Sequence, residues 1–323
     1  MYRSLLAAAL ALPLAAAAQT KWDMATAYAD SEFQTKNVRQ FANDIKKASG
    51  GKLEINVHSA QSLIKNPEIK RSIQTGLVPI GEFFLSNLGP ENPLYEVDAI
   101  PFLASSYPEA KALWEVSREP ISALFQKQGM RLLYSVPWPS QAFFTKEPVK
   151  SLADIKGKKM RTYNAQTARL GNLMGVIPTT VQATEIPQAF STGIIDLMFT
   201  SGPTGVTTRA WEYTRFFYDT GAWVPKNVVM VNEGAFRRLP ADVQKVVLDQ
   251  ARVAEDRGWK WSQSENDETP KILAKNGIKL DPITPQFRGE LKKIGETMLN
   301  DWLQKAGDDG KKVIAEFRKR VPQ

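Results

Sequence analysis

Short strand patterns alternate with helix patterns along the first part of this chain, and this alternation limits the fold more than any other feature. Gly50 and Gly51 end the first helix pattern, and Leu53, Ile55 and Val57 then alternate with polar residues as in a strand. The series comprises a strand at 22–27, a helix at 31–48, a strand at 52–58, a short helix at 67–75 and a strand at 77–85. Such a series predicts a mainly parallel sheet with helices on its faces.

The same alternation returns in the middle of the chain and predicts a second α/β lobe. Its strands are expected at 158–162, 177–180 and 195–199, with helices at 165–174 and 184–191. A helix at 107–128 and strands at 131–136 and 141–145 come before it, and the prolines of Pro137-Trp-Pro139 indicate a crossing between the lobes. A strand at 224–231 would return to the first lobe.

The segment from Pro240 to Ala274 contains no internal proline before Pro270 and carries an apolar stripe, which predicts one unusually long helix. We therefore expect a two-lobed α/β clamp with a mixed, mainly parallel sheet in each lobe, joined by hinge strands and the long helix. Lobe I would comprise 19–140 and about 225–265, and lobe II would comprise 141–224 and about 266–323. Clamps of this kind close on a ligand by hinge bending.

The amino-terminal segment has the pattern of a secretory signal peptide. Arg3 precedes an apolar run from Leu5 to Ala18, which ends in small residues. The run is shorter than the roughly 20 residues that a membrane helix needs, which disfavours an uncleaved anchor. We expect cleavage after residue 18, a mature chain that begins near Gln19, and a periplasmic location.

Composition excludes several kinds of site. The chain has no cysteine and a single histidine, His58, so thiol catalysis and multi-histidine zinc sites are ruled out. His58 is expected at a strand end, either on the surface or in contact with residues that line a site. Lysines and arginines alternate with carboxylates, which indicates solvated helix faces and not a nucleic-acid surface. No phosphate-binding glycine loop is present, and we expect no cofactor and no metal.

Arg161 is the strongest candidate binding residue. It lies in Gly157-Lys-Lys-Met-Arg-Thr-Tyr-Asn164, at the end of a short predicted strand and before a predicted helix. Open α/β sheets bind ligands at such crossovers, and a guanidinium presents parallel donors that match a carboxylate. From the residues alone, a surface ion pair with Asp154 or Asp196 remains an equal alternative.

Several motifs in order resemble the solute-binding proteins of tripartite ATP-independent periplasmic (TRAP) transporters, of the dicarboxylate-binding type. They are Gln74-Thr-Gly76, Ile100-Pro-Phe-Leu103, Ser151-Leu-Ala-Asp-Ile-Lys-Gly157, Lys159-Met-Arg161, Glu185-Ile-Pro-Gln-Ala-Phe190 and Thr192-Gly-Ile-Ile-Asp196. The resemblance implies a receptor, not an enzyme, that delivers an organic acid to a permease of two integral membrane subunits. It also implies that Arg161 holds the ligand carboxylate.

The resemblance suggests further positions around the ligand. Asn164 matches a frequent ligand contact, although it would also cap the following helix. At the position of Thr200, relatives commonly have asparagine. Here Thr200 and the next residue, Ser201, offer hydroxyls instead. Gln141 stands where sialic acid receptors carry a second arginine, so a second cationic anchor is missing.

Aromatic residues at strand ends and in loops are candidates for the cleft walls. We select Tyr28, Phe84, Trp138, Tyr163 and Trp223. One arginine with aromatic walls predicts an aromatic or other apolar monocarboxylate, or a 2-oxo or 2-hydroxy acid. A dicarboxylate stays open if polar neighbours serve a second carboxylate. Glu82 would either accept a hydrogen bond from a ligand hydroxyl or face solvent.

Two other classes of protein compete with the transport receptor. One is a periplasmic lyase with Tyr163 or a lysine as base near Arg161, although no paired acid and base occur at a recognisable spacing. The other is a receptor for a sensor kinase or an ATP-driven importer. A monomer is expected, and a dimer through the C-terminal helices remains the alternative.

Overall fold

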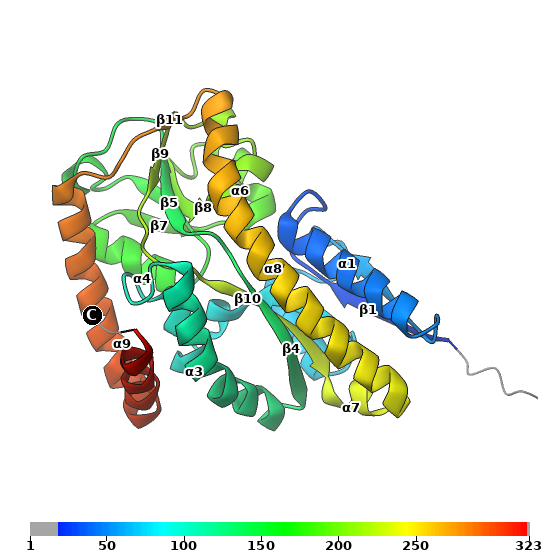
Figure 1. The fold of residues 1–323 in the computed structure, drawn as a ribbon. Helices are drawn as coiled ribbons and strands as arrows, with labels where there is room; N and C mark the ends of the chain where they lie inside the picture. Colours follow the sequence, from blue (N-terminus) through cyan, green and yellow to red (C-terminus); the bar gives the residue numbers. More distant parts are fainter. Residues whose placement is uncertain (1–18, 322–323) are drawn as a thin grey trace, which may run out of the picture.

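The structure is a computed structural model that describes residues 19–321, and it is built around two sheets (Figure 1). The expected signal peptide, 1–18, lies outside the described residues. The first sheet has the strand order β2-β1-β3-β10-β4. Its strands are β1 (Thr20–Ala25), β2 (Leu53–His58), β3 (Ile80–Phe84), β4 (Met130–Pro137) and β10 (Lys226–Asn232).

The second sheet has the order β11-β9-β5-β8-β6-β7. Its strands are β5 (Gln141–Thr145), β6 (Lys159–Thr162), β7 (Ile177–Thr180), β8 (Leu197–Ser201), β9 (Phe216–Asp219) and β11 (Lys279–Leu280). Both sheets are mixed. In the first, β1 is parallel to β2 and β3, whereas β10 runs antiparallel to β3. In the second, β6 is parallel to β7 and β8, whereas β5 runs antiparallel to β8. The predicted two-lobed α/β class is confirmed.

The chain crosses between the sheets at two places that touch each other. β4 ends at Pro137 in the first sheet and β5 begins at Gln141 in the second, as the prolines predicted. The return crossing lies between β9 and β10, and the Trp138 amide donates to the Pro225 carbonyl at 2.7 Å. This bond ties the two crossing segments together where a hinge would act.

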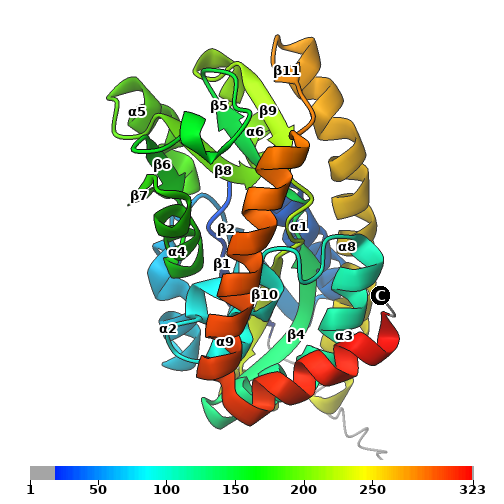
Figure 2. The ribbon, with the colours of Figure 1, turned by 90° about the vertical axis from the view of Figure 1, so that its left-hand side faces the viewer.

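Nine helices are present among residues 19–321, and they cover the sheets (Figures 1 and 2). They are α1 (Phe33–Ala48), α2 (Ile69–Gln74), α3 (Tyr107–Lys127), α4 (Ala165–Met174), α5 (Ile186–Ser191), α6 (Gly202–Thr207), α7 (Glu233–Arg237), α8 (Ala241–Lys275) and α9 (Pro285–Arg320). α8 confirms the expected long helix. It packs on α1 and β4 of the first sheet and, further along, on α6 of the second.

α9 bends sharply at Gly307, whose φ of +56° is a left-handed value that glycine adopts readily. Before the bend, Phe287 and Leu291 pack in the core of the second sheet. After it, Ile314 and Phe317 pack against the core that contains α3 (Figure 2). The helix therefore contacts both halves of the molecule, and the division into 19–140 with 225–265 and 141–224 with 266–323 stays a prediction.

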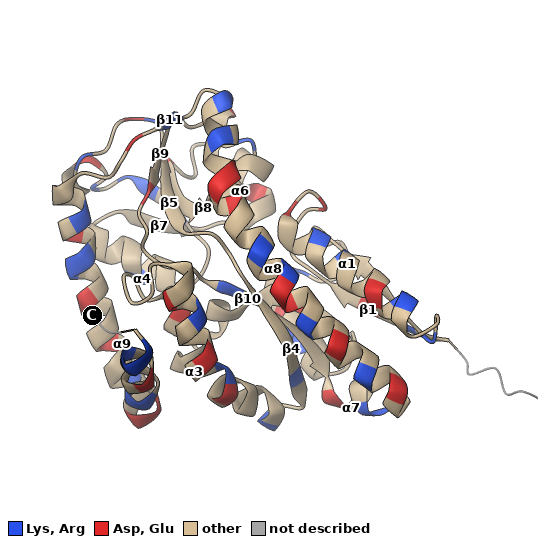
Figure 3. Cartoon of the chain, in the orientation of Figure 1, with Lys and Arg blue, Asp and Glu red and all other residues tan. Residues whose placement is uncertain are grey.

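Lysines and arginines alternate with aspartates and glutamates along α8 and α9 (Figure 3). This pattern agrees with the solvated helix faces that the sequence predicted. Within the described residues, no helix is both long enough and apolar enough to span a bilayer.

Some strands differ from the expected ones: β1 and β8 lie at 20–25 and 197–201 and not at 22–27 and 195–199. β3 begins at Ile80 and not at Leu77, because Gly76 (φ +77°) starts a turn in which Leu77 is 71% exposed. β9 and β11 were not expected, since each is short and lies at or next to a sheet edge. His58, at the end of β2, contacts Asp23 Oδ1 at 2.8 Å on the surface, as expected.

Candidate ligand-binding site

A cavity lies between the two sheets, at the ends of their parallel strands. It leaves about 60 Å3 accessible to the centre of a water molecule, which is room for several waters or a small organic molecule. Its lining comes from the ends of strands of both sheets and from the segments next to them. The lining residues are Ala27, Tyr28, Gln61, Asn66, Phe84, Asn87, Trp138, Gln141, Arg161, Tyr163, Gln182, Ala183, Thr200, Ser201 and Thr204. This is the place where open α/β sheets bind ligands.

Arg161 points into this cavity from β6 and is held in place by the protein. Its Nε donates to the Val181 carbonyl at 2.9 Å, and its Nη1 donates to Thr200 Oγ1 at 3.3 Å. The guanidinium also lies 5.1 Å from the ring centroid of Tyr163, a cation–π distance. These contacts fix the plane of the guanidinium and leave donors over for a ligand.

No carboxylate neutralises Arg161 among residues 19–321. Arg161 is 4% exposed and forms no ion pair with a described aspartate or glutamate. The two acids considered as surface partners serve other groups: Asp154 accepts from the amide of Ser151, and Asp196 accepts from the amide of Lys159. The surface ion-pair alternative is therefore wrong.

Burial lowers the pKa of Arg161 to about 10. The group is still protonated at neutral pH, so the cavity contains a desolvated cation without a counter-ion among the residues that the structure describes. A buried charge of this kind is costly until it is paired. An anionic ligand would supply that missing partner.

Aromatic rings form the apolar walls. Tyr28 and Trp138 meet edge to face at 5.0 Å, and Phe84 and Tyr163 do so at 5.4 Å. The polar ends of the first pair converge on one acceptor, because Tyr28 Oη and Trp138 Nε1 both donate to Asn227 Oδ1, at 3.2 and 2.9 Å. These four rings lie where the sequence predicted cleft walls.

The polar residues predicted at Gln141, Thr200 and Ser201 also line the cavity. Gln141 Oε1 accepts from Tyr163 Oη at 3.1 Å, and its Nε2 donates to the Pro139 carbonyl at 3.1 Å. Ser201 caps α6 and contacts Thr204 Oγ1 at 3.0 Å. Both side chains are thus oriented by the protein before a ligand arrives.

Three predicted residues lie outside the lining. Asn164 caps α4 through Thr167 and donates to Ser86 Oγ at 2.9 Å, so both polar atoms of its side chain have partners within the protein. Trp223 is buried in the core of the second sheet beside Phe199. Glu82 is 1% exposed and accepts from Thr26 Oγ1 at 2.6 Å, so the solvent-facing alternative for it is wrong.

Five polar residues in the lining were not predicted: Gln61, Asn66, Asn87, Gln182 and Thr204. Asn87 follows β3, Gln182 follows β7, and Gln61 and Asn66 follow β2. The signal that could have found Asn87 and Gln182 is their place just after a strand end, whereas Asn66 lies eight residues beyond β2 and Thr204 lies within α6.

Polar contacts also join the two sides of the cleft. Asn66 Nδ2 donates to Gln182 Oε1 at 2.8 Å, and Gln61 Nε2 donates to Thr184 Oγ1 at 3.1 Å. Further away, Thr207 Oγ1 donates to Glu32 Oε2 at 2.9 Å. Burial raises the pKa of Glu32 to about 7, although the hydrogen bond from Thr207 opposes this shift.

Residues 24–305 match the model of the family described as bacterial extracellular solute-binding protein, family 7. The chain belongs to this family. Its members, like the structural neighbours, are extracytoplasmic receptors of the TRAP type and not enzymes. The family resemblance inferred from the motifs is confirmed.

Individual relatives, two of them with solved structures, extend this result. A Bordetella pertussis extracytoplasmic solute receptor, DctP7, which binds pyroglutamic acid, is 47% identical with a TM-score of 0.92, over 93% of this chain and 99% of that chain. A marine metagenome TRAP receptor with co-purified pyroglutamate is 37% identical with a TM-score of 0.91, over 93% and 99%. A monocarboxylate 2-oxoacid-binding periplasmic protein of Nostoc sp. is 24% identical over 93% of this chain and 85% of its own length.

Proposed function

We propose that this protein is a receptor for pyroglutamate, and that Arg161 holds the carboxylate of this ligand. The observation that carries the proposal is the buried guanidinium without a protein counter-ion in a small cavity. Three similar structures, at 47%, 44% and 37% identity, bind pyroglutamate, which supports this acid among the small acids that the family binds.

The chemistry of pyroglutamate suits the lining. It is a monocarboxylate, and among the described residues that line this cavity Arg161 is the one cation. A guanidinium can donate two parallel hydrogen bonds to a carboxylate, and this geometry is stronger than a single bond. The flat ring would lie between the walls formed by Phe84, Tyr163 and Trp138. A dicarboxylate would leave its second charge without a cation, which is why we favour a single carboxylate.

Delivery to a TRAP permease in the periplasm is part of the proposal. The family is extracytoplasmic, and the leader pattern at 1–18 would direct export. Ligand binding would favour the closed arrangement, since the ligand contacts residues from both sheets at once. The two membrane subunits would then recognise the closed form.

A thermal-shift screen tests the proposed ligand. Purified protein is heated with L-pyroglutamate, pyruvate, succinate, phenylacetate and glucuronate, each over a range of concentrations. Stabilisation grows as RT ln(1 + [L]/Kd), so a ligand present at 100 times its Kd adds about 2.7 kcal/mol. We expect a large shift with pyroglutamate and small or no shifts with the others. A larger shift with any of the others would contradict the choice of ligand.

A further inference from the structure

Asn87 differs from the other carboxamides that line the cavity. Gln61, Asn66, Gln141 and Gln182 each have at least one side-chain atom in a hydrogen bond within the protein, although Asn66 Oδ1 is also buried without a partner. Asn87 forms no side-chain hydrogen bond with any residue in 19–321, and its Oδ1 is buried without a partner. A buried acceptor without a partner costs free energy, and native structures contain few of them.

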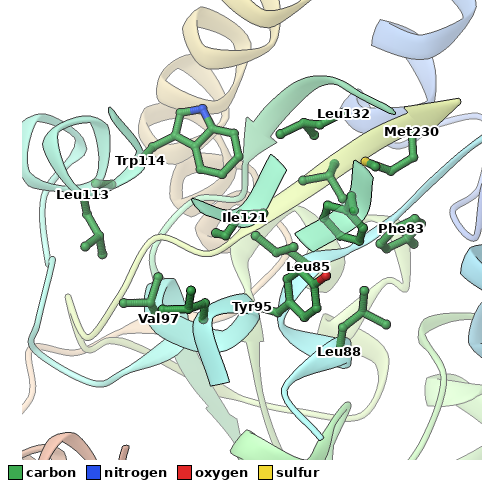
Figure 4. Packing of buried hydrophobic residues seen from close by; sticks show 14 of the residues in the cluster. Phe83, Leu85, Leu88, Tyr95, Val97, Leu113, Trp114, Ile121, Leu132 and Met230 are labelled. Carbon is green, nitrogen blue, oxygen red and sulfur yellow. The ribbon is translucent and has the colours of Figure 1, made fainter. Parts of the chain in front are cut away.

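The backbone that carries Asn87 is firmly placed. Asn87 lies in the 3-10 turn Leu85–Leu88 (η2), directly after β3. Leu85 and Leu88 are both buried in the core of the first sheet, as Figure 4 shows. The turn therefore has little freedom to rotate Asn87 towards another protein acceptor or donor.

The same turn touches the arginine segment on the opposite side of the cleft. Ser86 Oγ accepts from Asn164 Nδ2 at 2.9 Å, and Asn164 lies three residues after Arg161. Phe84, just before the turn, packs against Tyr163. Asn87 and Arg161 therefore approach one small cavity from the two sheets, so a ligand held by Arg161 would have its far end near Asn87.

A carboxamide carries an acceptor and donors side by side. A lactam ring presents the complementary pair on one edge, because its ring N–H and its carbonyl oxygen lie on the same side. Oδ1 of Asn87 can accept from the ring N–H while Nδ2 donates to the ring carbonyl, and the first of these bonds would give the buried oxygen its missing partner. Aromatic or aliphatic monocarboxylates offer no such edge.

We propose that Asn87 determines specificity by pairing with the lactam edge of the ligand, while Arg161 holds the carboxylate. This inference rests on the proposed function. A site that hydrogen-bonds a polar group rejects analogues that lack the group, because its own polar atoms are then left unpaired. Asn87 thus explains how one receptor would discriminate pyroglutamate from other small monocarboxylates.

The test compares two ligands by calorimetric titration. L-pyroglutamate is set against its lactone analogue, 5-oxotetrahydrofuran-2-carboxylate, in which a ring oxygen replaces the N–H. We expect the wild-type protein to bind the lactone at least about tenfold more weakly, as the loss of one hydrogen bond to a buried acceptor implies. Equal affinity of the wild-type protein for the two ligands would overturn the inference without any mutation.

Substitutions of Asn87 test whether this residue causes the preference for pyroglutamate over the lactone. Asn87→Leu should weaken pyroglutamate binding by about tenfold to a hundredfold and reduce the preference over the lactone to near unity. Asn87→Ala serves the same purpose with less bulk, and Asn300→Leu on the exposed face of α9 is the matched control. A preference that survives in Asn87→Ala would overturn the inference alone. A wild-type protein that does not bind pyroglutamate would overturn the proposed function and this inference with it.

Discussion

Glu82 shows how burial of a single carboxyl group connects the stability of the protein to pH. Burial raises the pKa of Glu82 from 4.5 to about 7, although the hydrogen bond from Thr26 opposes the shift. Between about pH 4.5 and 7 the folded state therefore binds more protons than the unfolded state. The free energy of unfolding falls as pH rises through this window.

Glu82→Gln should remove this pH-dependent loss, because the glutamine keeps an acceptor for Thr26 and cannot ionise. We expect the difference in melting temperature, variant minus wild type, to be larger at pH 8 than at pH 5. Thermal melts of both proteins at the two pH values measure the difference. Glu316→Gln, at a side chain that is 56% exposed, is the control. A difference that is the same at both pH values would show that Glu82 does not titrate in this way.

At the scale of elements, the long helix α8 approaches β4 more closely than a side chain permits. A Cβ at Gly258 would lie 2.4 Å from Cγ2 of Val136 and 2.9 Å from Nδ2 of Asn37. Glycine is therefore required here by packing, although it weakens a helix interior by about 1 kcal/mol relative to alanine.

Gly258→Ala should destabilise the protein by about 1–3 kcal/mol, since the clash outweighs the gain in helix propensity. Gly289→Ala in α9 is the matched control, because nothing lies within 4 Å of its added Cβ. That variant should be as stable as wild type or up to about 1 kcal/mol more stable. Chemical denaturation of both variants measures this. Equal effects at the two positions would refute close packing at Gly258.

The elements were largely predictable because their patterns are local. The spacing of apolar residues indicated α8, and the glycines and prolines indicated the ends of the strands and the crossing at Pro137–Pro139. The site was less predictable. All five residues of β3 are buried, so no alternation showed that Glu82 would lie against Thr26 while Asn87, beyond the strand, would line the cavity. Trp223 was expected at the cavity because its position after β9 does not reveal which core its ring enters.

At the scale of the whole molecule, hydrogen bonds across the cleft should favour the closed form. Asn66→Ala removes the donor to Gln182 Oε1, which joins the two sides at the mouth of the cavity. We expect ligand release to become severalfold faster, because one net hydrogen bond contributes about 0.5–1.5 kcal/mol. Stopped-flow fluorescence measures the dissociation rate.

Gln40→Ala is the control for this variant, since Gln40 bonds only to Asp44 within the exposed face of α1. Its release rate should equal that of wild type. An unchanged rate in Asn66→Ala would show that this contact does not hold the cleft closed.

The buried guanidinium of Arg161, which has no counter-ion among residues 19–321, should bind the carboxylate of the ligand. Calorimetric titration with L-pyroglutamate tests this claim most directly, using wild type, Arg161→Ala and Arg169→Ala. Arg169 is 49% exposed and pairs with Asp301, so it provides a matched arginine outside the cavity. We predict that Arg161→Ala loses about 2–5 kcal/mol of binding free energy while Arg169→Ala binds as wild type does. Equal binding by wild type and a folded Arg161→Ala protein would contradict the claim.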